Sequence, residues 1–341
     1  MSVLPTSAIA ADPEWLSHRL APGNGLFFRH VTRDRHRAVP FLTDEHLGAD
    51  GQTVRRSWND SLSAAPIGPV HFIFHSAFCA STLLVRAFDL EGVAMGLSEP
   101  VILNDIVGRR RRGEIDVQET GRLFDGALAL LGRPWSAGEA VIIKPSNILN
   151  PLAAGLLALR PQAKAIVLFA PLETFLVSVA RKGMHCRLWA RELIEGLIHE
   201  GVADLGFTPT DIFRQTDLQC AAVGWLVQHR LFVELLNRYG ASRVCSLSSE
   251  DLLADPVATL TAAGSHFELA VDRMIASQIA AGPVFSRHSK SGERFDRNLR
   301  TSAYEKVRSA HGDEIAMVVE WARAVAAAAD LPFDLDGRLA G

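Results

Sequence analysis

Residues 70–88 have the sequence VHFIFHSAFCASTLLVRAF, and this stretch determines which fold we expect. Residues 70–74 form a short apolar run typical of a buried strand, and residues 81–88 repeat apolar side chains at helical spacing. Residues 75–80 connect the two and predict a tight loop. A strand that leads through a short loop into a helix is the repeating unit of α/β folds.

The same alternation of strands and helices continues along the chain. Continuous apolar runs, of the sort buried in a parallel sheet, predict further strands at residues 141–143 and 165–169, and residues 243–247 look like another strand. Helices are predicted at residues 151–159, 172–182, 187–199 and 216–239, from Asp255 through residue 260, and at residues 313–328. Strands separated by helices imply right-handed crossovers, so we expect an α/β fold with a central, mostly parallel sheet flanked by helices.

Residues 1–68 precede this alternation and have no clear periodicity. Turn-forming residues at 21–25 predict irregular structure, and Asp12 followed by Pro13 is a predicted helix start. We therefore expect residues 1–68 to be a segment that decorates the core, and residues 69–341 to form the main domain.

Composition excludes several classes of function. The formal net charge of -3 argues against a protein that binds nucleic acid by neutralising phosphates over a broad face. The basic run at residues 109–112 is more simply explained as a solvated helix end or loop than as a patch for an acidic partner. The four cysteines show no CxxC pair and no metal-like spacing with histidine, so we expect buried, reduced thiols and no metal site. Without a signal peptide or an apolar stretch of about 20 residues, the sequence favours a cytoplasmic protein that does not bind a membrane.

The loop between the first predicted strand and its helix has the features of a phosphate site. Where a helix begins, free backbone N–H groups and the positive end of the helix dipole point at one place. Hydroxyl groups of Ser and Thr add donors there without adding bulk. We expect the phosphates of a nucleotide to bind at His75, Ser76, Phe78, Cys79, Ala80, Ser81, Thr82 and Leu83. The glycines and the lysine of a Walker A motif are absent, and the simpler alternative is an ordinary strand–helix turn capped by Ser81.

Lys144 ends the apolar run at residues 141–143. A side chain at the carboxyl end of a parallel strand points into the crevice where α/β proteins bind ligands. A buried charge is costly, so a lysine in this position usually faces an anion or a carboxylate. The alternative is a lysine that extends from the strand end to solvent.

The order and spacing of these motifs resemble the P-loop sulfotransferases, which transfer a sulfuryl group from 3′-phosphoadenylyl sulfate (PAPS) and release PAP. Residues 80–84, Ala-Ser-Thr-Leu-Leu, match the second half of that family's phosphosulfate loop. The family has a Lys or Arg where this chain has Phe78. The resemblance implies a three-layer P-loop fold, and it implies that Lys144 stabilises charge on the transferred group.

The same resemblance suggests the general base. Glu99, in the sequence GLSEP at residues 96–100, lies where tyrosylprotein-type sulfotransferases have a catalytic carboxylate, which would accept the proton of the acceptor hydroxyl. Considered alone, Glu99 is more simply explained as a cap of a helix that starts at Pro100. Cytosolic sulfotransferases have a catalytic His two residues after the strand-end lysine. Ser146 occupies that position here and completes the expected catalytic set with Glu99 and Lys144.

Further residues correspond to the family's site for the 3′-phosphate of the donor. Ser178 matches the serine of that site, whereas Ala170 replaces the arginine that usually accompanies it. Arg181, together with Lys182 and Arg187, is a candidate phosphate clamp from a different direction, or else a solvated helix end.

The C-terminal third resembles the same family. Residues 244–256 resemble its strand followed by Glu-Asp-Leu and Asp-Pro. Arg287, Lys290 and Gly292 in the following basic loop are candidates for contact with the 3′-phosphate, or belong to a mobile polar loop.

We therefore expect a sulfotransferase-like enzyme that binds a nucleotide donor and a small-molecule or peptide acceptor with a hydroxyl or amine group. Two alternatives remain at this point. One is a P-loop kinase that uses a nucleoside triphosphate with Mg²⁺. The other is a descendant that binds a nucleotide but does not catalyse transfer. Neither the acceptor nor the oligomeric state is encoded in a recognisable motif.

Overall fold

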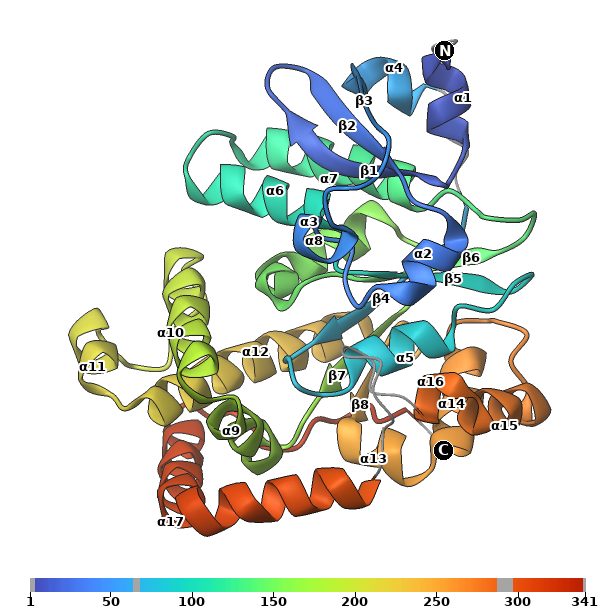
Figure 1. Ribbon diagram of the computed structural model, residues 1–341. Helices are drawn as coiled ribbons and strands as arrows, with labels where there is room; N and C mark the ends of the chain where they lie inside the picture. The colour runs from blue at the N-terminus through green and yellow to red at the C-terminus, as the bar shows by residue number, and fades with distance from the viewer. Residues whose placement is uncertain (1–3, 64–67, 287–296, 340–341) are drawn as a thin grey trace.

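The centre of the fold is a five-stranded parallel sheet, which Figure 1 shows in the computed structural model of the protein. The structure describes residues 4–63, 68–286 and 297–339. The strands, which are hydrogen-bonded in the order β5-β6-β4-β7-β8, are β4 (Val70–His75), β5 (Ala94–Ser98), β6 (Ala140–Lys144), β7 (Ala165–Phe169) and β8 (Val244–Ser248). All neighbouring pairs in this sheet are parallel, which confirms the expected α/β fold.

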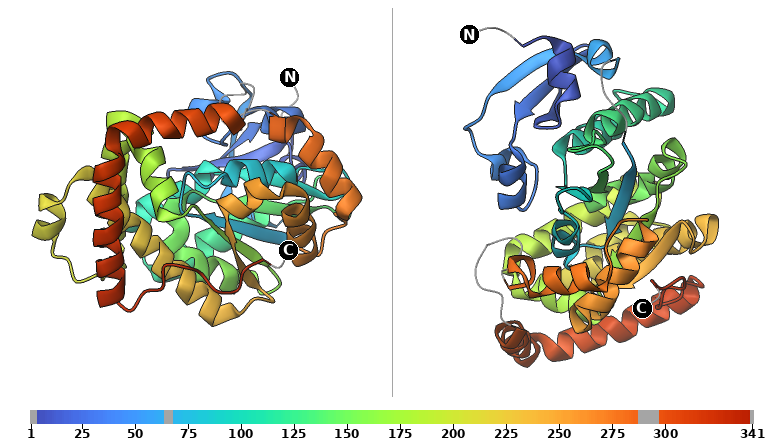
Figure 2. Two further views of the ribbon diagram at one scale, coloured as in Figure 1. Left: turned by 90° about the horizontal axis from the view of Figure 1, so that it is seen from below. Right: turned by 90° about the vertical axis from the view of Figure 1, so that its right-hand side faces the viewer.

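Helices cover both faces of this sheet (Figure 2). The helix that follows β4, α5 (Ser81–Ala87), lies against β5 and β6, whereas α12 (Asp217–Tyr239) lies against β8. Helices after α5 also include α6 (Val101–Arg111), α7 (Val117–Leu131), the 3₁₀ helix η1 (Asn147–Leu152), α8 (Ala153–Leu159), α9 (Leu172–Arg181), α10 (Gly183–His199), α11 (Pro209–Arg214), α13 (Ser249–Ala254), α14 (Pro256–His266), α15 (Arg273–Ala281), α16 (Pro283–Ser286) and α17 (Arg297–Ala328). Within the described ranges, no helix combines the length and the apolar character needed to cross a membrane.

The connections of the chain diverge at the middle of the sheet. From β4 the chain passes to β5 on one side, and from β6 it later passes to β7 on the other side of β4. In open α/β sheets, ligands bind outside the carboxyl ends of the strands at such a switch point. β4 ends at His75 and β6 ends at Lys144, so two of the predicted site residues lie at this edge.

The N-terminal segment is more regular than its sequence suggests. It contains an antiparallel three-stranded sheet in the order β1-β2-β3, formed by β1 (Trp15–Ala21), β2 (Gly25–His30) and β3 (Thr53–Ser57). Short helices accompany it: α1 (Thr6–Ala11), α2 (Arg33–Ala38), α3 (Asp44–Leu47) and α4 (Trp58–Leu62). The prediction of irregular structure was therefore wrong for much of this segment.

The predicted helix start at Asp12 was also wrong. Helix α1 ends at Ala11, and Asp12 Oδ1 accepts a hydrogen bond of 2.9 Å from the backbone N of Glu14. An aspartate that binds the backbone two residues ahead forms a local turn instead of a helix cap. This turn leads the chain into β1.

Two further differences concern the core. Strand β5 was not predicted, because it is only five residues long, contains Gly96 and has no β-branched residue. The glycine is required there, since a Cβ at Gly96 would lie 2.4 Å from the carbonyl oxygen of Val85 in α5. The helix predicted at residues 151–159 is divided, with η1 ending at Leu152 and α8 beginning at Ala153.

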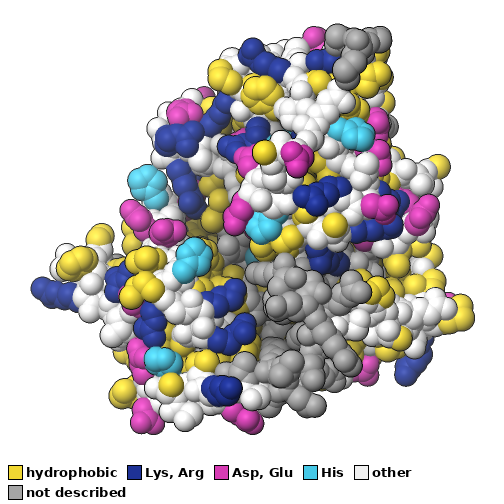
Figure 3. All heavy atoms as spheres, in the orientation of Figure 1, with side chains coloured by type: hydrophobic (Ala, Val, Ile, Leu, Met, Phe, Trp, Pro, Cys, Tyr) yellow, Lys and Arg dark blue, Asp and Glu magenta, His cyan; other side chains and the backbone are white. Residues whose placement is uncertain are grey.

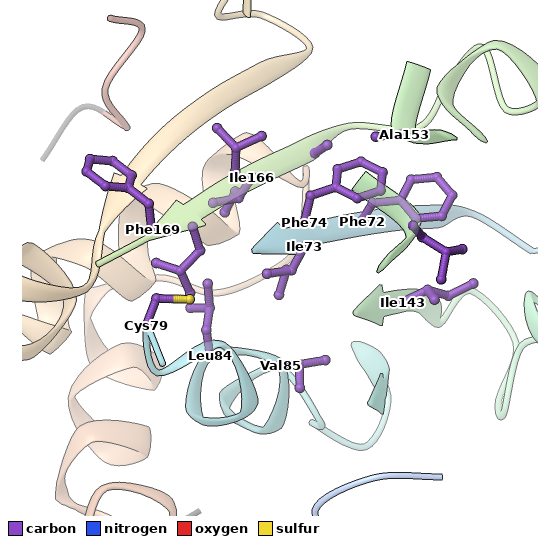
Figure 4. Packing of buried hydrophobic residues seen from close by; sticks show 14 of the residues in the cluster. Phe72, Ile73, Phe74, Cys79, Leu84, Val85, Ile143, Ala153, Ile166 and Phe169 are labelled. Atoms are coloured by element: carbon purple, nitrogen blue, oxygen red, sulfur yellow. The ribbon is translucent and has the colours of Figure 1, made fainter. Parts of the chain in front are cut away.

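One hydrophobic core joins the sheet to its helices. Figure 4 shows Ile73 of β4 between the helix residues Leu84 and Val85 and the neighbouring strands. The side chain of Cys79, from the loop before α5, lies beside Leu84 in the same core. All four cysteines of the chain are buried, as expected.

Candidate functional site

The loop between β4 and α5 has an unusual backbone. Ala77, Phe78 and Ala80 have φ angles of 70°, 52° and 62°, in the left-handed region. That region costs a residue with a side chain roughly 1–2 kcal/mol. Left-handed residues in a short loop direct backbone N–H groups to one side and form a concave site for anions. Strain of this kind persists where the surrounding structure enforces it, which occurs most often at functional sites.

The start of α5 also differs from an ordinary helix start. Its N-cap residue is Ala80, and no side chain caps it; Ser81 is already the first helical residue. The alternative of a turn capped by Ser81 is therefore wrong. By contrast, Thr216 at the start of α12 forms a full capping box with Gln219. An uncapped helix start leaves its first N–H groups available to a ligand.

His75 holds the loop at its beginning. Its Nδ1 accepts a hydrogen bond of 3.1 Å from the backbone N of Ala77. An imidazole nitrogen that accepts has no proton, so the neutral ring has its proton on Nε2. Nε2 lies 3.1 Å from the carbonyl oxygen of Pro145, to which it donates, and 3.8 Å from Oε1 of Glu99. His75 thus connects the phosphate-type loop to the end of β6.

Three buried amides support the same loop from below. Asn147 and Asn150 are three residues apart in η1, and the 3₁₀ geometry places such residues on one side. Both donate to Oε1 of Gln228 in α12, over 3.1 and 2.9 Å. Asn150 also donates to the carbonyl of His75 over 3.0 Å, and Gln228 Nε2 lies 3.5 Å from the carbonyl of Ser76. This network fixes the backbone at the point where the strained loop begins.

Glu99 and Lys144 form an ion pair at the ends of adjacent strands. Ser98 and Lys144 are paired in register between β5 and β6, and the backbone N of Glu99 donates to the carbonyl of Lys144 over 2.7 Å. The ammonium of Lys144 donates to Oε1 of Glu99. Lys144 is only 1% exposed, so it does not extend to solvent, whereas the Glu99 side chain is 19% exposed. The structure therefore brings these two predicted catalytic residues into direct contact.

Glu99 itself has a strained backbone, with a φ of 51°. Helix α6 begins at Val101, its N-cap is Pro100, and no side chain caps it. The alternative role of Glu99 as a helix cap is therefore wrong. The left-handed conformation directs the chain out of β5 beside Lys144.

The N-terminal segment forms one wall of this site. The backbone N of Leu42 donates to the carbonyl of Ser98 over 2.8 Å, and the Leu42 carbonyl accepts from Val101 over 3.3 Å. These two hydrogen bonds flank Glu99 on both sides. The ring of Phe41 lies 4.9 Å from the Lys144 ammonium, a distance at which a cation is attracted to an aromatic face.

The remaining loop residues face the core. Cys79 is fully buried, and this burial raises the pKa of its thiol, although the nearby ammonium of Lys144 and a hydrogen bond with Ser81 oppose the shift. A thiol in this state is a packing group and a poor nucleophile. Ser81, Thr82 and Leu83 are buried in the first turn of α5.

One face of α9 borders the loop. Phe175, Ser178 and Lys182 follow each other at intervals of three and four residues, so they lie on the same side of the helix. The ring of Phe78 lies 5.6 Å from that of Phe175, and the ammonium of Lys182 lies 4.6 Å from the Phe78 ring centroid. Ser178 is therefore on the face that meets the loop. Its place beside the donor stays a prediction.

Ser178 and Arg181 meet at Tyr304 of α17. The Ser178 hydroxyl is hydrogen-bonded to the Tyr304 hydroxyl over 2.9 Å, and the Arg181 guanidinium lies 5.9 Å from the same ring. Arg187, by contrast, lies 3.9 Å from the carboxylates of both Asp217 and Glu314. These carboxylates balance its charge, and the role of Arg187 in a phosphate clamp stays a prediction.

Other predicted residues have less defined surroundings. Ser146 is half-buried at the start of η1, and its hydroxyl has no hydrogen bond with any residue that the structure describes. Arg287, Lys290 and Gly292 lie outside the described residues. Within the described ranges, no His, Cys, Asp and Glu side chains are grouped as metal ligands.

The basic run at residues 109–112 is not simply a solvated helix end. Arg110 and Arg111 both form ion pairs with Glu200, whose side chain is 1% exposed. The run therefore fastens α6 to the end of α10. The expectation of a solvated run was wrong for these two arginines, because the buried carboxylate lies almost 90 residues away in sequence, at position 200.

Sequence reasoning did not find the residues that support the site. Asn147, Asn150 and Gln228 could have been suspected only in part, because two asparagines at a spacing of three follow the strand-end lysine. Nothing in the sequence identifies Phe41 or Leu42, since their contacts depend on how a distant segment docks.

Comparison with known proteins gives a limited result. No protein-family model matches the chain, and no curated protein matches it. Among solved structures, the sulfotransferase domain from the curacin biosynthetic pathway is 14% identical with a TM-score of 0.45, covering 73% of this chain and 98% of that one. The sulfotransferase domain from the Synechococcus PCC 7002 olefin synthase is 17% identical with a TM-score of 0.44, covering 72% and 89%. The fold class itself rests on the strand order described above.

Proposed function

We propose that the protein is a sulfotransferase that moves a sulfuryl group from PAPS to an acceptor hydroxyl or amine. The observation on which this rests is the buried Lys144–Glu99 pair, placed beside a strained and uncapped strand–helix loop at the switch point of the sheet. The order of motifs along the sequence, from the loop to Ser178, supports the same donor.

The residues have distinct roles in this proposal. Backbone N–H groups of the loop and the hydroxyls of Ser81 and Thr82 bind the phosphosulfate end of the donor. Lys144 stabilises negative charge on the oxygens of the group in transfer. Its burial strengthens this effect, because electrostatic interactions are larger where water is excluded.

Glu99 is the proposed general base. Its Oε1 accepts from Lys144, whereas Oε2 has no hydrogen bond with any described residue. Oε2 is therefore the oxygen that takes the acceptor's proton as the acceptor oxygen or nitrogen attacks sulfur. The bond between sulfur and the phosphate oxygen breaks in the same step, and PAP leaves with the negative charge.

The contact between Glu99 and Lys144 also favours an active enzyme over a nucleotide-binding descendant without activity. A protein that only binds a nucleotide has no need of a carboxylate in a left-handed conformation at the end of β5.

Ligand binding and transfer test this proposal together. We expect PAP to raise the melting temperature of the protein, with no comparable effect of ATP with Mg²⁺ or of plain sulfate. We expect Glu99→Gln to lower transfer of labelled sulfuryl from PAPS by about 10²- to 10⁴-fold while it retains PAP binding, because only the proton acceptor is removed. An unchanged melting temperature at millimolar PAP would contradict the donor. A Mg²⁺-dependent shift with ATP would instead support a kinase.

A further inference from the structure

The loop contains an aromatic residue, Phe78, at the place where a basic side chain was expected. Its backbone is left-handed, and its ring lies 5.6 Å from Phe175 of α9 and 5.2 Å from Trp189 of α10. The two helices therefore hold the ring in a fixed position at the mouth of the loop. The ammonium of Lys182 lies 4.6 Å from the centre of this ring.

Lys182 differs from Arg187 in having no carboxylate partner among the described residues. In the described part of the chain, no Asp or Glu lies within ion-pair distance of its ammonium. Arg187 is balanced by Asp217 and Glu314, and Arg181 packs over Tyr304. Of these three basic groups, Lys182 is the one with a charge directed at the loop.

The position of Lys182 is set by the fold. It is the residue between α9 and α10, and the following Gly183 has a φ of 67°, a turn that changes the direction of the chain. Lys182 continues the face of α9 that contains Ser178. Basic side chains gather beside α9 and α10 in the space-filling view of this face (Figure 3).

We propose that Lys182 supplies the positive charge that the loop itself lacks, and that it binds the phosphosulfate oxygens of the donor at the mouth of the loop above Phe78. This inference rests on the proposed function. Lys144 then approaches the donor from the sheet and Lys182 approaches it from α9. The phosphosulfate is held between two ammonium groups that come from different elements.

Lys182 can leave the ring of Phe78 for the phosphosulfate, because the second contact is the stronger one. An exposed contact between a cation and an aromatic ring contributes less than a hydrogen bond to a charged group. An ammonium that rests on Phe78 therefore moves to an anion that enters the loop, and the ring keeps it close until then. Burial among these groups also lowers the pKa of Lys182, with Arg181 adding to the shift.

The test moves the positive charge from position 182 to position 78. We expect Lys182→Met to weaken PAP binding about tenfold or more, measured by titration calorimetry, because one charge-assisted contact is lost. In the double variant Phe78→Lys with Lys182→Met, the charge returns to the loop, and most of the affinity should return. The dependence of log Kd on log salt concentration should become shallower in Lys182→Met and steeper again in the double variant.

Lys164→Met is the matched control. Lys164 lies just before β7, at the amino end of the strand and therefore at the end of the sheet opposite the site. It pairs with Glu268. We expect this variant to bind PAP like the wild type. If the wild type binds PAP and Lys182→Met binds it equally well, with the same salt dependence, the role of Lys182 is overturned while the proposed function stands. If the wild type does not bind PAP, the proposed function fails, and this inference fails with it.

Discussion

Arg133 and Lys144 are both buried cations, and they differ in what surrounds them. Arg133, 2% exposed, donates to five backbone carbonyls, which belong to Ile9, Ala10, Asp12, Trp15 and Leu130. Lys144, 1% exposed, donates to one carboxylate that itself reaches solvent. Each also lies over an aromatic ring, Phe28 for Arg133 and Phe41 for Lys144.

In the proposed function, this difference separates a cation that stabilises the fold from one that takes part in the reaction. The Arg133 guanidinium donates to neutral carbonyls of the chain before β1, of the first residue of β1 and of α7, and so it fastens the N-terminal segment to the end of α7. The ammonium of Lys144 has hydrogen-bond donors that Glu99 does not use. Among the described residues, Glu99 is its only charged partner. A cation whose N–H donors all have acceptors stabilises a fold, whereas a cation with unused donors can bind a ligand.

The largest expected effect follows from replacing Lys144 by Met. Transfer from PAPS should fall about 10³-fold, which corresponds to about 4 kcal/mol of transition-state stabilisation, because the charge on the transferred group loses its buried partner. The free energy of unfolding should change little, since Glu99 can be hydrated. Steady-state kinetics and denaturant unfolding on the same sample measure both quantities. A loss of stability that matches the loss of activity would show that Lys144, like Arg133, mainly stabilises the fold.

The opposite pattern is expected for Arg133→Met. Four carbonyls of the N-terminal segment would lose their donor while buried, and the free energy of unfolding should fall by about 3 kcal/mol. Donor binding by the folded fraction should remain close to that of the wild type at low temperature. A variant as stable as the wild type in urea would show that Arg133 does not fasten the segment.

An effect that appears only at acidic pH concerns His36, which is buried and has no hydrogen-bond partner at either ring nitrogen among the described residues. Burial, with Arg133 and Arg33 adding to it, lowers its pKa from 6.5 to about 3. The unfolded chain therefore takes up a proton below pH 6.5 that the folded protein cannot, so the free energy of unfolding decreases as the pH falls from 6.5 toward 3.

His36→Phe should remove this part of the pH dependence. At pH 4 the variant should be about 3 kcal/mol more stable relative to the wild type than it is at pH 7, as measured by urea unfolding at both values. The same pH slope in both proteins would mean that His36 is protonated in the folded state. His71 is a suitable comparison, because burial lowers its pKa to about 4 and Arg133 is not among the causes of that shift.

The sequence predicted the parts of the fold that depend on short-range patterns. The strand 165–169 was placed correctly, and the strand before the loop and α5 were placed to within a residue, because continuous apolar runs and a helical repeat leave little choice. β5 was missed because its five residues have weak strand propensity, and its existence depends on Gly96 fitting against α5.

In the candidate site, too, short-range patterns could be predicted and contacts that depend on packing could not. Lys144 could be predicted because the end of a parallel strand determines where its side chain points. The direct contact of Lys144 with Glu99 depends on which strands become neighbours, and the contact of Lys182 with Phe78 depends on how α9 packs. Arg133 gave no signal at all, because its partners are backbone carbonyls from another part of the chain.

The contacts of Leu42 determine when the candidate site is completed during folding. Its two backbone hydrogen bonds, to Ser98 and Val101, join a point before β3 to both sides of Glu99. The segment that contains Leu42 is synthesised before the sheet it docks on, yet it can dock only after β5 has formed. The Glu99 carboxylate is therefore held in place last, and local opening of the N-terminal segment would release this proposed general base while the parallel sheet stays intact.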